Sequence, residues 1–205
     1  MKTLKKTCLA LAAVALAVLA LPGERILLSS APFGVTCRIM TMEGEIRVRV
    51  YPGKAPVSAA NFLRYVEAGL YDGSSFFRVV TPDNQPNDKV RIEVIQGGDV
   101  ADDKCFPPIV HETTAKTGLR HLDGTVSMAR AEPGTATSSF FICVNDQPEL
   151  DFGGRRNPDG QGFAAFGRVI RGMEVVRRIQ RLAADGQALM RPVPIRTISR
   201  EKSEK

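Results

Sequence analysis

The segment Glu45-Ile-Arg-Val-Arg-Val-Tyr51 alternates apolar with charged side chains, and Pro56-Val-Ser-Ala-Ala-Asn-Phe-Leu-Arg-Tyr-Val-Glu-Ala68 follows after a short turn. The alternation in the first segment has the period of a strand that is buried on one face. The second segment begins with a proline, which suits the first turn of a helix, and Gly69 suits the C-terminal end of that helix. Four apolar side chains share one face of this predicted helix, namely Ala59, Phe62, Leu63 and Val66.

Short apolar runs separated by turn residues continue on both sides of these two elements. Such runs are typical of strands, whereas residues 173–182 form a second amphipathic pattern that predicts a helix. Strands without a regular strand–helix alternation favour an antiparallel barrel or sandwich that carries two helices. Further strands are predicted over residues 35–42, 75–80, 90–96, 125–130, 140–145, 164–170 and 193–199.

The composition is that of a single-domain globular protein. The 205 residues are 43% hydrophobic and 24% charged, which excludes a disordered chain and a protein with several membrane spans. The formal net charge is +6, but Lys2, Lys5 and Lys6 at the start of the chain account for half of it. The remaining charge is weak and dispersed, so we predict no nucleic-acid partner.

The first twenty residues have the pattern of a secretory signal peptide. The three lysines precede an uncharged apolar run over residues 7–21, and small residues stand near Ala20. We therefore expect a signal peptide over 1–20, a linker over 21–34, the folded domain over 35–200 and a charged tail over 201–205. The mature protein would be a periplasmic or secreted monomer without a stable membrane span. An uncleaved N-terminal anchor is the alternative.

Few residues of the domain carry chemistry that can be recognised on its own. Cys37, Cys105 and Cys143 form no Cys-x-x-Cys pair, so they predict neither a zinc site nor a redox motif. A Cys37–Cys105 bridge stays open for an oxidising compartment, and Cys143 lies in an apolar run that suits a buried side chain. His111 and His121 lack the spacing of metal ligands. We therefore predict no metal and no cofactor.

Seven short segments carry a pattern that spans nearly the whole predicted domain. They are Asn61-Phe-Leu-Arg-Tyr-Val-Glu-Ala-Gly-Leu-Tyr-Asp-Gly73, Ser75-Phe-Phe-Arg-Val79, Gln96-Gly-Gly-Asp99, Gly124-Thr-Val-Ser-Met-Ala-Arg130, Ser139-Phe-Phe-Ile142, Leu150-Asp151 and Phe166-Gly-Arg-Val169. Their content and order resemble the cyclophilins, a family of peptidyl-prolyl isomerases. The resemblance implies a mainly β fold, an eight-stranded antiparallel barrel capped by two α-helices, in agreement with the strand pattern.

The resemblance also implies catalysis of rotation about X–Pro bonds without a cofactor or metal. The barrier to that rotation, about 18–20 kcal/mol, arises from amide resonance. By resemblance Arg78 is the catalytic arginine, Gln96 holds the substrate backbone and supports the arginine, and Phe141 is the floor of the proline pocket. Without the resemblance, Arg78 would be interpreted as an outward strand residue and Phe141 as barrel core.

Eight further positions match residues that bind the substrate in this family. Leu150 matches a wall of the proline pocket, and Ala129 and Arg130 match the segment that pairs with the peptide before the proline. At the other positions the family usually has a Phe-Met pair, a second glutamine, a tryptophan or another aromatic residue, and a histidine or tyrosine. This chain departs from that pattern with Glu93 and Val94, Ser139, Glu149 and Phe163.

These observations support a leading hypothesis and an alternative. The first is a prolyl isomerase that assists the folding of exported proteins, with proline-containing peptides and unfolded exported proteins as its partners. The departures from the family pattern motivate the second, a catalytically weak cyclophilin-like module that binds proline peptides. A metal or redox protein built on Cys37, Cys105 and His111 has little support.

Overall fold

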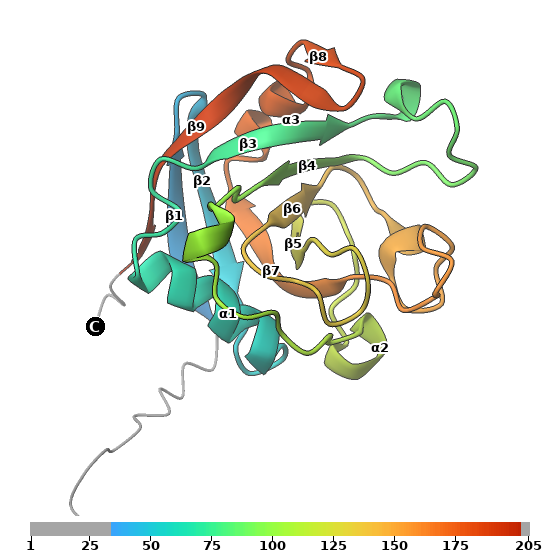
Figure 1. Ribbon diagram of the computed structural model, residues 1–205, viewed down its shortest axis with the longest axis horizontal. Coiled ribbons are helices and arrows are strands. Elements are labelled where there is room, and N and C mark those ends of the chain that lie inside the picture. Colours follow the sequence, from blue (N-terminus) through green and yellow to red (C-terminus); the bar gives the residue numbers. More distant parts are fainter. Residues whose placement is uncertain (1–33, 202–205) are drawn as a thin grey trace, which may run out of the picture. The chain divides into compact units, whose positions relative to one another are not determined.

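The structure is a computed structural model and describes residues 34–201 of the chain (Figure 1). The predicted signal peptide, the predicted linker apart from its last residue, and the predicted tail apart from Glu201 lie outside the described residues. Within the described part, no helix is both long enough and apolar enough to cross a membrane.

Nine antiparallel strands form one sheet that closes on itself. Their order is β1-β2-β7-β5-β6-β4-β3-β9-β8, and β9 pairs with β1 as well as with β3. That additional pairing closes the barrel, so the predicted eight-stranded antiparallel barrel is confirmed, with the two-residue β8 added beside β9. The strands are β1 Val35–Thr41, β2 Gly44–Val50, β3 Ser75–Val80, β4 Val94–Gly97, β5 Thr125–Met128, β6 Phe140–Cys143, β7 Ala164–Arg171, β8 Ala184–Asp185 and β9 Ala188–Arg200.

Two strands begin four or more residues away from the predicted positions. β4 begins at Val94 rather than at residue 90, because the buried side chain of Gln85 takes the place of a neighbouring strand there. Gln85 Oε1 accepts a hydrogen bond from Ile92 N at 3.2 Å, and Gln85 Nε2 donates to Ile92 O at 2.8 Å. β9 begins earlier than predicted, at Ala188, because its first residues form a hairpin with β8.

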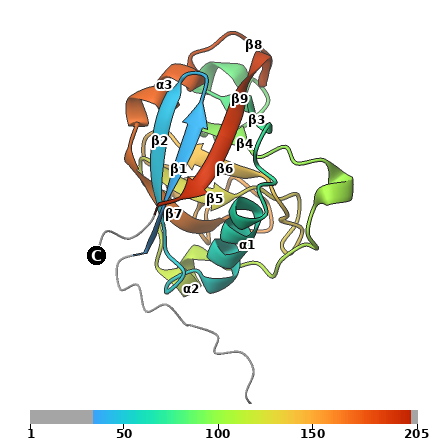
Figure 2. The same cartoon turned by 90° about the vertical axis from the view of Figure 1, so that its left-hand side faces the viewer.

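Two helices lie toward opposite ends of the barrel (Figure 1 and Figure 2). α1 (Pro56–Glu67) packs against β7 and β9, and α3 (Met173–Gln180) packs against β2 and β4. Both helices are predicted by the sequence, whereas the single turn α2 (Thr114–Thr117) is not. Three short 3₁₀ turns complete the described elements, namely η1 Pro82–Asn84, η2 Asp102–Lys104 and η3 Pro148–Leu150.

The N-terminus of α1 is capped by a residue from a distant loop. Ala55 at the cap position has no side-chain acceptor, and the first helical residue is Pro56. The buried carboxylate of Glu112 accepts hydrogen bonds from Val57 N at 3.1 Å and from Ser58 N at 2.7 Å, and from the Ser58 hydroxyl at 2.7 Å. A carboxylate at this end also interacts favourably with the helix dipole. Glu112 therefore fixes α1 to the segment before α2.

Strand β6 separates two apolar clusters, because successive side chains point to opposite faces of a sheet. Phe140 and Ile142 belong to the core inside the barrel, where the rings of Phe140 and Phe62 meet edge to face with centroids 5.4 Å apart. Phe141 and Cys143 belong to a smaller cluster, which also contains Val80, Ile92, Val94 and Leu150. The residue expected at the floor of the proline pocket is therefore outside the barrel core.

The three cysteines of the domain are free thiols, so the Cys37–Cys105 bridge left open by the sequence does not form. Cys37 is buried among the core residues, and Cys105 Sγ lies 3.6 Å from Ser138 Oγ. Burial raises the pKa of the Cys37 thiol to about 12, which keeps it protonated and unreactive near neutral pH. Cys143 is buried, as its apolar surroundings predict. Residues 34–201 contain no group of three side chains arranged to hold a metal ion.

Candidate active site

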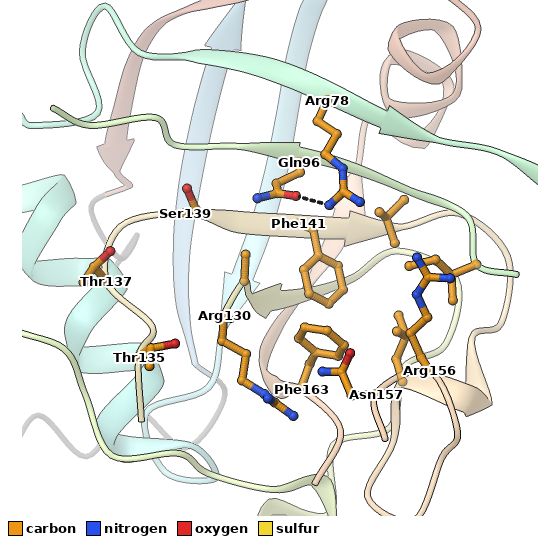
Figure 3. A pocket seen from close by; sticks show the side chains of 14 residues that line it. Arg78, Gln96, Arg130, Thr135, Thr137, Ser139, Phe141, Arg156, Asn157 and Phe163 are labelled. Atoms are coloured by element: carbon orange, nitrogen blue, oxygen red, sulfur yellow. Dashed lines mark hydrogen bonds between the residues drawn. The ribbon is translucent and has the colours of Figure 1, made fainter. Parts of the chain in front are cut away.

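Arg78, Gln96 and Phe141 form a row across three neighbouring strands. Arg78 on β3 is the register partner of Gln96 on β4, and Gln96 is the register partner of Phe141 on β6. Residues directly opposite each other project from the same face of a sheet, and the three side chains meet at one pocket (Figure 3). Arg78 Nη1 donates a hydrogen bond to Gln96 Oε1 at 2.8 Å. The three residues that the sequence assigns to catalysis therefore lie together.

A second glutamine holds the guanidinium of Arg78 from another side. Gln187 Oε1 accepts hydrogen bonds from Arg78 Nε at 3.0 Å and from Arg78 Nη2. Gln187 Nε2 in turn donates to the backbone oxygen of Asn84 at 3.3 Å. Because both glutamines are neutral, they orient Arg78 without compensating its charge. Burial lowers the pKa of Arg78 below its ordinary value, and the charge of Arg156 lowers it further.

The apolar part of the pocket lies beside Arg78, and the pocket has a volume of about 410 Å³. Phe141 forms its floor, and the ring of Phe163 stands at 90° to that of Phe141 with centroids 5.3 Å apart. The remaining apolar walls are Ile92, Val94 and Leu150. A pocket of this kind can hold a flat aliphatic ring and exclude water from one side of it.

The opposite wall of the pocket is more polar than this apolar end. It contains Thr135, Thr137 and Ser139, which lie across the pocket from Arg156 in Figure 3. The backbone of Ala129 follows the same side, and its N–H donates to Ser139 O at 2.9 Å. Hydroxyl groups and exposed backbone along one wall can pair with the backbone of an extended peptide.

Arg130 lines the pocket, but its charge is already compensated. Its side chain is 1% exposed, and Nη1 and Nη2 donate to the two carboxylate oxygens of Asp159 at 2.8 and 3.0 Å. Its Nε donates to Gly162 O at 2.9 Å, and its guanidinium carbon lies 5.1 Å from the centroid of the Phe163 ring. Arg130 therefore holds the 152–162 loop and the Phe163 wall in place.

A buried polar network supports the pocket floor from behind. The His121 ring stacks on the Phe141 ring at a centroid distance of 6.0 Å and an angle of 16°. The two nitrogens of His121 lie 2.8 Å from Asp151 Oδ1 and 3.0 Å from Ser127 Oγ. Burial acts to raise the pKa of Asp151, but hydrogen bonds from the His121 ring and backbone outweigh it and bring this pKa below its ordinary value. His121 is thus a hydrogen-bonding support of the floor.

Glu93 lies outside the pocket, contrary to the sequence expectation. Consecutive residues of an extended segment face opposite ways, so Glu93 and Val94 cannot both form the wall. Val94 faces the pocket together with Ile92, whereas Glu93 accepts a hydrogen bond from Asn145 Nδ2 at 3.0 Å. The partner of Glu93 is therefore an amide group outside the pocket.

Glu149 also lies outside the pocket. It stands in the 3₁₀ turn η3 next to Leu150, and only Leu150 points inward. Glu149 Oε1 pairs with Arg155 Nη2 at 2.7 Å, and Glu149 Oε2 accepts a hydrogen bond from Arg155 N at 2.8 Å. These hydrogen bonds from Arg155 lower the pKa of the Glu149 carboxyl. The cyclophilin resemblance implies an aromatic contact at this position, but the Glu149 side chain forms an ion pair with Arg155 at the surface instead.

The other nine residues assigned from the sequence all line the pocket, namely Arg78, Val94, Gln96, Ala129, Arg130, Ser139, Phe141, Leu150 and Phe163. Sequence reasoning missed five lining residues, Ile92, Thr135, Thr137, Arg156 and Asn157, and it also missed Gln187 behind Arg78. Strand alternation alone could have indicated Ile92. No local pattern indicates Arg156, Asn157 or Gln187, because loops place them.

The comparison with known proteins agrees with this fold. The sequence profile of the family described as cyclophilin type peptidyl-prolyl cis-trans isomerase/CLD matches residues 36–200. Peptidyl-prolyl cis-trans isomerase A of Dickeya dadantii (strain 3937) is 38% identical over 165 residues, which cover 78% of each chain. Peptidyl-prolyl cis-trans isomerase B of Escherichia coli (strain K12) is 33% identical over 159 residues, which cover 75% of this chain and 89% of that protein. The chain belongs to the cyclophilin-type peptidyl-prolyl cis-trans isomerase family.

A solved structure shows the same fold at lower sequence identity. The crystal structure of a cyclophilin type peptidyl-prolyl cis-trans isomerase of Cryptosporidium parvum, determined in the presence of the dipeptide Ala-Pro, has a TM-score of 0.63 and 22% identity. The match covers 82% of this chain and 99% of that chain. At this identity the match describes the barrel and its order of elements.

The position of Gln187 leads to a testable prediction. We expect Gln187→Ala to lower kcat roughly tenfold with little change in KM, because Arg78 loses one of the two amides that orient it. Asp185→Ala, an exposed change in the same hairpin, should leave both constants unchanged. Exchange NMR on an Ala-Pro peptide measures kcat and KM, and thermal unfolding checks the fold. A purely structural role would lower stability without this separation of kcat from KM.

Proposed function

We propose that this protein catalyses cis/trans isomerisation of X–Pro bonds, and that its natural substrates are unfolded exported proteins. The observation that carries the catalytic part is a guanidinium, held by Gln96 and Gln187, at the edge of an apolar pocket whose floor is Phe141. An oriented donor beside a pocket that binds the ring can stabilise the twisted state of an X–Pro bond.

The geometry supports a mechanism that forms no covalent intermediate. As the X–Pro bond twists, the prolyl nitrogen loses its conjugation with the carbonyl and regains a lone pair. Arg78 can donate a hydrogen bond toward that nitrogen, and this contact is stronger in the twisted state than in either planar isomer. Each 1.36 kcal/mol of this difference raises the rate about tenfold. Because Arg78 is oriented before the substrate binds, little reorganisation accompanies the reaction.

The pocket holds one side of the bond while the other side turns. A proline ring packed on Phe141 between Phe163 and Leu150 would be fixed, so the preceding carbonyl would be the part that rotates. The His121 stack behind Phe141 makes this floor rigid. The Cryptosporidium relative was crystallised in the presence of Ala-Pro, which supports an Ala-Pro peptide as the first substrate to test.

The exported setting rests on the sequence of residues 1–20. A basic start, an apolar run and small residues near Ala20 support a secretory signal, and hence a periplasmic or secreted monomer that acts on newly exported chains. Mass spectrometry of the protein recovered from the exported fraction tests this directly. Cleavage near Ala20 is expected, whereas an intact N-terminus in the cytoplasmic fraction would contradict export.

Exchange NMR on a short Ala-Pro peptide with catalytic amounts of the mature chain tests the activity. Uncatalysed exchange takes tens to hundreds of seconds, so a faster rate is readily detected. The same protein should accelerate the proline-limited refolding phase of a secreted protein. Peptide binding without acceleration would instead identify a proline-peptide-binding module, the alternative suggested by the departures from the family pattern.

A further inference from the structure

Arg156 brings a second positive charge to the wall of the pocket. It lies in the 152–162 loop and lines the pocket across from Ser139, with a side chain only 13% exposed (Figure 3). Its backbone N–H donates to Glu149 O at 3.1 Å, and its Nη1 donates to Val90 O at 2.7 Å. Contacts from two separate segments therefore fix the position of this guanidinium.

The side chains that line the pocket carry net positive charge. None of its lining residues is acidic. Arg130 is neutralised by Asp159, but Arg78 contacts only neutral glutamines. Arg156 Nη1 forms an ion pair with Asp88 Oδ2 at 3.1 Å, and the Asp88 side chain is 42% exposed to water. Among the residues that the structure describes, Arg156 Nε and Nη2 donate to no partner, so these donors remain for a ligand.

We propose that Arg156 makes this protein prefer substrates with an acidic side chain directly after the proline. The inference rests on the proposed isomerase function, in which the proline ring lies on Phe141. The residues before the proline are expected along Ala129 and Ser139, so the residue after it lies toward the opposite wall, where Arg156 stands. The planar fork of an arginine suits a carboxylate, and its two remaining donors can bind one.

The test compares peptides that differ only in charge and position. Ala-Ala-Pro-Glu-Ala, Ala-Ala-Pro-Gln-Ala and Ala-Glu-Pro-Gln-Ala are assayed by exchange NMR with the mature protein. We expect kcat/KM to be about fivefold higher for Glu after the proline than for Gln, as for a partly exposed ion pair. The ratio should fall at about 0.5 M salt, because ions screen the pair. Glu before the proline should give no gain.

Variants assign the preference to Arg156. The ratio of interest is kcat/KM for the peptide with Glu after the proline divided by kcat/KM for the peptide with Gln there. In the Arg156→Gln variant this ratio should fall to about one, and in the Arg156→Glu variant it should fall below one. Arg155→Gln is the matched control, because Arg155 is the neighbouring arginine, exposed and outside the pocket, and it should keep the wild-type ratio. Asp88→Asn tests the same idea without changing Arg156, and it should raise the ratio by removing a competing carboxylate.

The outcomes separate this inference from the function on which it rests. Equal turnover of all three peptides by the wild type, or a ratio that Arg156→Gln leaves unchanged, overturns the preference but not the isomerase function. A gain only for Glu before the proline overturns the assigned direction of the peptide, and with it the preference as stated. Absence of turnover for every peptide overturns the proposed function itself.

Discussion

Arg78→Ala should reduce kcat/KM for an Ala-Pro peptide by about a hundredfold or more, with no substantial loss of stability. Removal of one preorganised donor to the transition state costs a factor of about 10²–10³ in other enzymes, which corresponds to about 2.7–4 kcal/mol. The side chain lies on the outer face of the barrel at the pocket, so its removal leaves no cavity in the core. Exchange NMR gives the rate and thermal unfolding gives the stability.

Two further variants make the result specific to the guanidinium. Arg78→Lys keeps the positive charge but loses the planar fork that reaches both Gln96 and Gln187, so most of the activity should still be lost. Arg168→Ala removes an exposed arginine from another strand of the same barrel and should have no effect. Near-normal turnover by Arg78→Ala would exclude this arginine as the catalytic donor.

The barrel and the row of candidate catalytic residues could be predicted because both follow from strand alternation and from well-marked segments. Arg78, Gln96 and Phe141 occupy register positions on paired strands, so a correct alignment of strands brings them together. The same alternation explains why Ile92, and not Glu93, lines the pocket with Val94. The prediction placed two consecutive residues at the wall, and the structure places residues two apart, Ile92 and Val94.

The loop contributions could not be predicted in this way. Gln187 reaches Arg78 across 109 positions of sequence, and Arg156 reaches Val90 across 66. Neither contact can be predicted from a sequence period or motif, because each depends on the conformation of a loop outside the barrel strands. The sequence therefore predicts the candidate reaction centre, whereas the loops add the orientation of Arg78 and the charge that we propose sets substrate preference.

The contribution of Glu112 to stability could not be predicted from the sequence either. Its sequence neighbourhood, His111-Glu112, begins like a metal-binding helix and continues differently, and nothing local indicates a role. In the structure its side chain crosses 54 positions of sequence to Ser58 and occupies the N-terminal end of α1. The residue is 2% exposed, so water cannot readily replace its hydrogen bonds.

Glu112→Ala should lower the free energy of unfolding by about 3 kcal/mol, because three donors, Val57 N, Ser58 N and the Ser58 hydroxyl, lose a charged acceptor together. Glu112→Gln keeps an oxygen at the site and should lose less. Glu132→Ala, an exposed change, should stay within about 0.5 kcal/mol of the wild type. Urea unfolding of the mature chain measures all three. A loss below about 1 kcal/mol in Glu112→Ala would mean that the helix end is hydrated or capped by other groups, and that α1 does not depend on this contact.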